Sequence, residues 1–139
     1  MRKDEQRLWD TMKRNAPPEF WLRRIENEVG EGEPDVLAMV KPFGERWVEL
    51  KATTRPARPT TRLLNHDTRL RPSQRTWHKK ANAYGATSFV LIRDDCGNLY
   101  LLPGELALEI NDMSVAEAED ANLAETWAQI FDTIRGARK

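Results

Sequence analysis

The chain has a single cysteine, Cys96, among its 139 residues, so no disulfide can form within it. One unpaired thiol favours a reducing, cytoplasmic setting. No apolar run approaches the roughly 20 residues of a membrane-spanning helix. The first residues, 1–7, lack the apolar centre of a signal peptide. We therefore expect a cytoplasmic protein that has no membrane partner.

The chain has 22 acids and 22 bases, but they are unevenly distributed: one segment has almost no acids and another has no Lys or Arg. Residues 51–80 hold nine bases and one acid, Asp67, whereas residues 94–125 hold nine acids and neither Lys nor Arg. This asymmetry indicates a basic surface that faces a polyanion such as nucleic acid. Two solvated faces of opposite sign are the plainer alternative.

Regular elements can be placed along most of the chain. The expected helices are 2–14, 19–29, 72–84, 104–110 and a last helix after the capping box of Ser114 and Glu117, with Leu123, Trp127, Ile130, Phe131 and Ile134 on its apolar face. The expected strands are 36–40, 46–52, 87–92 and 99–102. This order predicts one α/β domain over residues 1–139, with a mixed central sheet flanked by helices.

The segment 53–70 shows no period, and a loop this long is usually functional or disordered. Its arginines continue into the next helix, and we interpret them as phosphate contacts. Such contacts give affinity with little sequence specificity. The expected DNA-binding residues are Arg55, Arg58, Arg62, Arg69, Arg71, Arg75, Lys79 and Lys80. No base-reading motif accompanies them, so recognition by DNA shape is expected.

The stretch WVELK, residues 47–51, places an acid and a base together. Side chains alternate along a strand, so Glu49 and Lys51 share one face and Trp47 borders them. If strands 36–40 and 46–52 form a hairpin, Asp35 approaches Glu49. Two adjacent carboxylates repel each other unless a cation lies between them, and oxygen ligands suit Mg²⁺. A solvated ion pair is the alternative for Glu49 and Lys51 taken alone.

These motifs together resemble the PD-(D/E)XK nuclease superfamily. The matching stretches are GEPDV (32–36) and WVELK (47–51), and LRPSQ (70–74) is similar to the additional Gln motif of the VRR-NUC and Holliday-junction-resolvase-like branch, of phage or bacterial type. The resemblance covers about residues 24–102 and implies a restriction-endonuclease-like α-β-β-β-α-β core. Extra helices precede and follow this core, the last part being a C-terminal helical extension over about 104–136.

The resemblance also implies the chemistry. Asp35 and Glu49 would bind Mg²⁺, for which Mn²⁺ would substitute, with the Leu50 carbonyl as a further ligand. Lys51 would position the attacking water, and Gln74 would support the site or contact substrate. Glu26 would complete the acidic cluster, in competition with Glu28, Glu31 and Glu33.

The implied activity is an endonuclease that cuts branched DNA in recombination or repair, in a bacterial host cell if the protein is phage-encoded. Symmetric cutting of two strands needs two sites, so a homodimer is expected. The apolar face of the last helix would either form the dimer contact or cover the sheet. The rivals are a restriction-like or flap-nicking nuclease and a non-catalytic DNA-binding or inhibitory protein. A zinc site from His66, His78 and Cys96 is disfavoured because these residues lack paired ligand spacing.

Overall fold

The computed structural model describes residues 2–25, 32–42 and 44–136. Its centre is a five-stranded sheet in the order β1-β2-β3-β4-β5. The strands are β1 (Phe20–Arg24), β2 (Val36–Val40), β3 (Gly44–Thr53), β4 (Ser88–Asp94) and β5 (Leu99–Pro103). Only β3 and β4 are parallel to each other, and the other neighbours are antiparallel. The predicted mixed sheet is confirmed.

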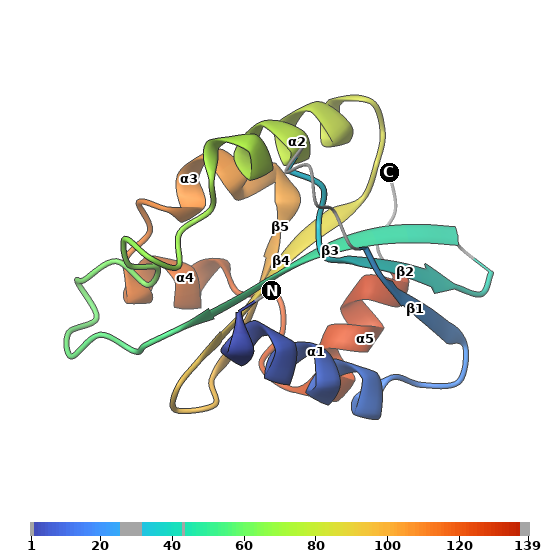
Figure 1. Cartoon of the computed structure of the whole chain (residues 1–139), viewed down its shortest axis with the longest axis horizontal. Helices are drawn as coiled ribbons and strands as arrows, with labels where there is room; N and C mark the ends of the chain where they lie inside the picture. Colours follow the sequence, from blue (N-terminus) through green and yellow to red (C-terminus); the bar gives the residue numbers. More distant parts are fainter. Residues whose placement is uncertain (1, 26–31, 43, 137–139) are drawn as a thin grey trace.

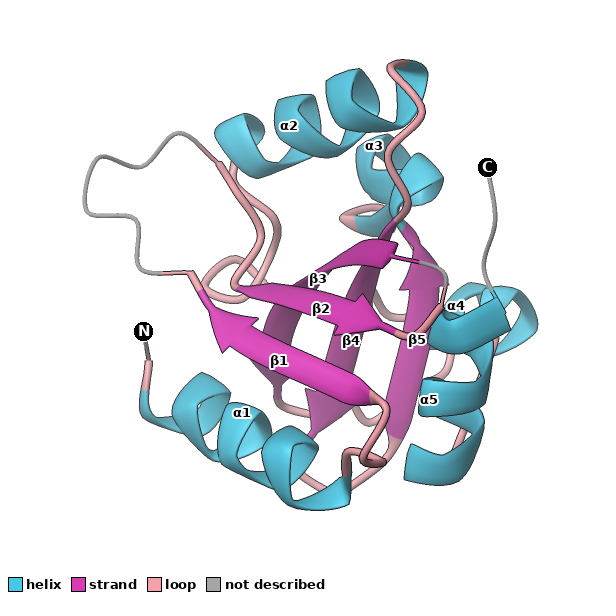
Figure 2. Cartoon of the chain, turned by 90° about the vertical axis from the view of Figure 1, so that its right-hand side faces the viewer, coloured by secondary structure: helices cyan, strands magenta, loops and turns pink. Residues whose placement is uncertain are grey.

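Helices cover both faces of this sheet (Figures 1 and 2). On one face, α1 (Lys3–Asn15) and α5 (Trp127–Gly136) pack against inward side chains such as Val48 and Leu50. The other face carries α2 (Pro72–Ala83), the 3₁₀ turn η1 (Gly104–Leu106), α3 (Ala107–Ile110) and α4 (Val115–Ala121). The order α1-β1-β2-β3-α2-β4 has the α-β-β-β-α-β form that the resemblance implies, but its first helix is Lys3–Asn15, which was expected to precede the core, and not the expected helix 19–29.

The predicted helix 19–29 is wrong where the structure describes it, because Phe20–Arg24 is a strand. It pairs antiparallel with β2, from Phe20 opposite Val40 to Arg24 opposite Val36. The adjacent apolar residues resembled a helical face, but tertiary pairing decided the conformation. Trp21 lies on the outer side of β1 and is 61% exposed.

The last predicted helix is divided into α4 and α5. Leu123 lies between the two helices and is 47% exposed, contrary to its predicted inward position. Ile130, Phe131 and Ile134 are buried against the sheet, as the covering alternative proposed. This apolar face is therefore not available as a dimer contact. The capping box of Ser114 and Glu117 is present at the start of α4.

The long segment before α2 is ordered by its leucines. Leu63, Leu64 and Leu70 are buried in the core on the α3 side of the sheet. Backbone hydrogen bonds join Leu63 to Met113, and Thr53 Oγ1 contacts Thr68 Oγ1 at 2.9 Å. The arginines of this segment are thus carried on a defined surface. Within the described residues, no helix is both long enough and apolar enough to span a membrane.

Candidate active site

The β2–β3 hairpin brings Asp35 to the middle of β3. Strand β2 begins at Val36, which pairs with Val48 of β3. Strand β3 continues beyond Val48 to Thr53, so from Glu49 onward β2 no longer covers this edge of β3. The Asp35 carboxylate occupies this edge, where its Oδ2 accepts a hydrogen bond from the Leu50 amide at 2.8 Å. The amide and the carbonyl of one strand residue point to the same side. The Leu50 carbonyl therefore points to the edge that Asp35 occupies.

Glu49 is enclosed, with a side chain that is 1% exposed. Its Oε2 accepts a hydrogen bond from Gln74 Nε2 at 3.1 Å. Its Oε1 is buried and has no hydrogen-bond partner among the described residues. Burial is the main cause that raises the pKa of Glu49 well above its usual value, and the Asp35 carboxyl raises it further, whereas Lys51 lowers it. The predicted approach of Asp35 to Glu49 is thus present in the fold.

Lys51 lies two residues beyond Glu49 on the same strand face and is buried, as is Glu49. Its Nζ lies 3.4 Å from the Arg69 carbonyl oxygen, which tethers the ammonium to the end of the preceding loop. The charge of Lys51 lowers the pKa values of Glu49 and Glu5. A buried ammonium among carboxylates differs from the solvated ion pair that was the sequence alternative.

Glu5 of α1 is an acid of this cluster that the sequence reasoning missed. The pKa of Glu5 is raised, first by burial and then by Asp35, while Lys51 and Arg2 oppose the rise. The signal was available in the helix pattern. Glu5 stands on the same helical face as Leu8, Trp9 and Met12, all of which are buried. An acid on the inward face of an amphipathic helix needs a partner in the interior.

Glu26, the expected first acid, lies outside the described residues, as do Glu28 and Glu31. Glu33 is described, but no interaction links it to Asp35 or Glu49. The acidic cluster that the structure defines consists of Glu5, Asp35 and Glu49, with Lys51 beside it.

The donor set of this cluster fits a divalent metal. The Asp35 and Glu49 carboxylates and the Leu50 carbonyl are hard oxygen ligands of the kind that Mg²⁺ and Mn²⁺ take. The buried Oε1 of Glu49 lacks a hydrogen-bond donor, and two carboxyl groups lie in contact. Both features disfavour the metal-free state and are relieved by a cation. The residues that would hold it are Asp35, Glu49 and the Leu50 carbonyl. Glu5 adds negative charge nearby, but its carboxylate does not gather with those of Asp35 and Glu49 into one group of ligand atoms.

Gln74 is fixed in orientation by the start of α2. Its Oε1 accepts a hydrogen bond from the Arg71 amide at 2.8 Å, which leaves Nε2 to face Glu49. Because the amide is engaged on both sides and buried, the support alternative fits Gln74 better than direct substrate contact. Trp47, on the same strand face, packs edge-on against Trp77 at 5.3 Å between ring centroids.

The basic residues divide into two groups. Arg55 is engaged by Asp94, Tyr100 and Glu119, and Arg62 pairs with Asp112 at 3.2 Å. Arg75 donates to the Leu108 carbonyl. The remaining members of the expected DNA-binding set are solvent-exposed: Arg58, Arg69, Arg71, Lys79 and Lys80. We expect these five residues, more than the other three, to contact phosphate. The backbone carbonyl of Arg69 also accepts a hydrogen bond from Lys51 Nζ.

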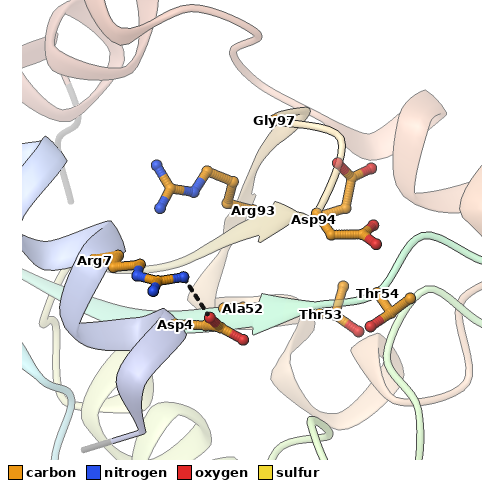
Figure 3. A pocket seen from close by; sticks show the side chains of 9 residues that line it. Asp4, Arg7, Ala52, Thr53, Thr54, Arg93, Asp94 and Gly97 are labelled. Carbon is orange, nitrogen blue, oxygen red and sulfur yellow. Dashed lines mark ion pairs between the residues drawn. The ribbon is translucent and has the colours of Figure 1, made fainter.

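A separate pocket of about 330 Å³ lies beside α1 and the β4–β5 turn (Figure 3). Arg7 and Asp4 pair at 3.5 Å on its α1 side. Asp94, Asp95 and Cys96 bring ligand-type atoms together there. However, Asp94 accepts hydrogen bonds from the amides of Cys96 and Asn98 and thereby holds the turn. Cys96 and the buried His78, which contacts Ser88, lie at opposite ends of β4, so the zinc set is not assembled.

No protein-family model and no curated protein sequence matches the chain. Among solved structures, the chain is similar to Hjc, a Holliday junction resolvase from the archaeal hyperthermophile Archaeoglobus fulgidus. The two share 17% identity with a TM-score of 0.45, over 75% of this chain and 72% of the other. At this level of similarity, the match does not determine what this chain does.

Proposed function

We propose that the chain is a Mg²⁺-dependent endonuclease that hydrolyses DNA phosphodiester bonds. The observation that carries the proposal is the Asp35 carboxylate beside the enclosed Glu49 at the open edge of β3, with Lys51 on the same strand face and Glu5 of α1 nearby. When bound there, the metal supplies Lewis-acid stabilisation of the scissile phosphate and lowers the pKa of the attacking water. Mn²⁺ has the same ligand preference and is expected to substitute.

The chain's own residues have separate tasks in this proposal. Asp35 and Glu49 hold the metal, and Glu5 adds negative charge beside them. The Lys51 ammonium orients the attacking water, since the tether to the Arg69 carbonyl keeps it beside the carboxylates. Gln74 fixes one oxygen of Glu49, so that the carboxylate does not rotate. The rigid β3 strand, buried on its far side by Val48 and Leu50, keeps these groups in register.

Branched DNA is the proposed substrate class. The support is the sequence resemblance, together with exposed bases on the segment that leads from β3 into α2: Arg58, Arg69 and Arg71. Phosphate contacts of this kind read the position of the backbone and not the bases. A homodimer is proposed with it, through a surface other than the buried face of α5. A restriction-like or flap-nicking nuclease differs only in the DNA shape that this surface accepts.

The test is a cleavage panel of labelled four-way junction, 5′ flap and linear duplex DNA, each with Mg²⁺ and with EDTA. We expect Mg²⁺-dependent cleavage, fastest on the junction, and its loss in Asp35→Asn. The exposed loop acid Asp67 provides the matched control, Asp67→Asn, which should cleave as the wild type does. Junction binding without cleavage by any metal would instead favour the non-catalytic DNA-binding rival.

A further inference from the structure

Helix α2 presents two polar side chains to Glu49 from successive turns. Gln74 and His78 stand four residues apart and therefore share one face of the helix. Gln74 Nε2 donates to Glu49 Oε2 at 3.1 Å, whereas His78 Nε2 lies 3.7 Å from Glu49 Oε1. Each oxygen of the carboxylate thus faces its own polar group on α2. His78 has no task in the proposed chemistry, although it is completely buried.

The two atoms at 3.7 Å are both unsatisfied. Glu49 Oε1 and His78 Nε2 are buried and have no hydrogen-bond partner within the described residues. Leaving a buried donor and a buried acceptor unpaired is costly, on the order of 1–3 kcal/mol for each group. A shift of less than ~1 Å would bring the pair to hydrogen-bond distance. When Glu49 binds a metal, its carboxylate can make this shift toward His78 Nε2.

The other side of the imidazole ring is held firmly. His78 Nδ1 contacts Ser88 Oγ at 2.8 Å, and Asn82 Nδ2 donates to the same Oγ at 2.7 Å. The amide nitrogen of Asn82 can only donate, so the Ser88 hydroxyl accepts there and has its own proton to give to Nδ1. Nδ1 then acts as the acceptor. The ring proton belongs on Nε2, which faces Glu49.

Gly104 closes the space behind this contact. A Cβ atom at this position would lie 1.8 Å from Ser88 Oγ and 2.9 Å from His78 Nδ1. Any side chain there would displace the hydroxyl that fixes the ring. The start of η1 therefore packs directly against the Ser88–His78 contact. The ring has one defined position and one defined proton-bearing nitrogen.

We infer that His78 is a positioning residue for the metal site: its Nε2–H, oriented by Ser88 and Asn82, holds Oε1 of Glu49 so that the carboxylate faces the metal. The role of His78 rests on one part of the proposed function, namely that Glu49 is a metal ligand. The same residue would otherwise be a core histidine satisfied by Ser88 alone. In that case the chemistry at Nε2 would not influence metal affinity.

Two substitutions separate these roles. In His78→Gln, the amide nitrogen lies at about the reach of the ring Nε2 and can donate to Glu49. In His78→Asn, the shorter amide can meet Ser88 but does not reach Glu49. Both variants lose the ring and suffer similar packing loss, so a purely structural role predicts the same result for both. The probe is Mn²⁺ alone, titrated into the full-length chain by calorimetry, with the folded state checked by circular dichroism.

Loss of a residue that orients a metal ligand typically weakens metal affinity 10- to 100-fold, so we expect His78→Asn to raise the Mn²⁺ Kd by ~10-fold or more, and His78→Gln to stay within about threefold of the wild type. Equal Mn²⁺ affinity in folded His78→Asn and wild type would overturn the inference. A wild type that binds Mn²⁺ but cleaves no DNA would refute the proposed nuclease and leave this inference standing.

A second measurement needs no variant. Nitrogen-15 NMR of histidine-labelled, metal-free wild type distinguishes a protonated ring nitrogen from an unprotonated one. For His78 we expect a neutral ring with the proton on Nε2 and none on Nδ1. A ring with its proton on Nδ1 would direct the acceptor nitrogen at a carboxylate and would overturn the inference, even if both His78 variants failed to fold.

Discussion

Replacing Glu49 with glutamine should stabilise the metal-free protein while abolishing the stabilisation that a divalent metal provides. Glutamine keeps the shape of the side chain. Its one carbonyl oxygen can accept from Gln74 Nε2 or from His78 Nε2–H but not from both, so part of the gain is offset. The substitution removes the charge that burial and the Asp35 carboxyl disfavour. Function and stability therefore oppose each other at this position, as they do at sites where like charges are held for a cation.

The size of the effect follows from the burial of Glu49. A buried ion without full compensation costs several kcal/mol, and part of that cost is already offset by Lys51 and Gln74. We expect a gain of ~1–3 kcal/mol in the free energy of unfolding of the metal-free protein. For a domain of this size, that corresponds to a rise in Tm of ~3–10 °C. Metal at 100 times its Kd should stabilise the wild type by ~2.7 kcal/mol.

The direction of the Glu49 pKa shift determines how the stability difference between Glu49→Gln and the wild type changes with pH. The folded-state pKa of Glu49 lies above the value of 4.5 for a free side chain, so protonated Glu49 costs the fold nothing below pH 4.5. Stability is lost as the pH rises from there through the folded-state pKa. The advantage of Glu49→Gln should therefore be absent at about pH 4 and grow toward neutral pH.

The assay is thermal unfolding with EDTA and with Mg²⁺, at several pH values. The matched control is Glu45→Gln, an exposed acid on the same strand, which should leave Tm and the Mg²⁺ response unchanged. A Glu49→Gln protein that is less stable than the wild type in EDTA at neutral pH would refute the reasoning. So would a Mg²⁺ response equal to that of the wild type.

Three further predictions concern neighbouring residues. Glu5→Gln should lower Mg²⁺-dependent cleavage and Mn²⁺ affinity at least ~10-fold, whereas Asp4→Asn, its exposed neighbour on α1, should stay near the wild type in both measurements. Gly104→Ala should lower the free energy of unfolding in urea by ~1–3 kcal/mol, because its Cβ collides with Ser88; an unchanged urea midpoint would contradict the close packing. Burial lowers the pKa of His78 from 6.5 to about 4, so the wild type should lose stability as the pH falls from 6.5 toward 4. In urea unfolding measured at each pH, His78→Gln should not show this pH-dependent loss of stability.

The sequence predicts the arrangement of those candidate site residues that lie in one hairpin. Asp35, Glu49 and Lys51 follow from strand alternation and a short turn, and both are local properties of the chain. Gln74 was singled out because LRPSQ (70–74), at the start of the next helix, resembles the additional Gln motif. These features do not depend on how distant elements pack.

The missed features depend on packing between distant segments. Glu5 enters the cluster only because α1 lies against β3, and no motif near Asp35 points to it. Phe20–Arg24 became a strand through its pairing with β2, although its apolar residues also suit a helix. The partner of His78 is Ser88, ten residues away at the start of β4. Contacts of this kind arise from the fold and are not visible as sequence periodicity.

The most direct test of the proposed nuclease is a single-turnover reaction of the purified wild type with a labelled four-way junction and increasing Mg²⁺. The account predicts cuts at defined positions near the branch, at a rate that rises with Mg²⁺ and saturates, and none in EDTA. An intact junction at every Mg²⁺ and Mn²⁺ concentration, with a folded protein that binds the DNA, would contradict it.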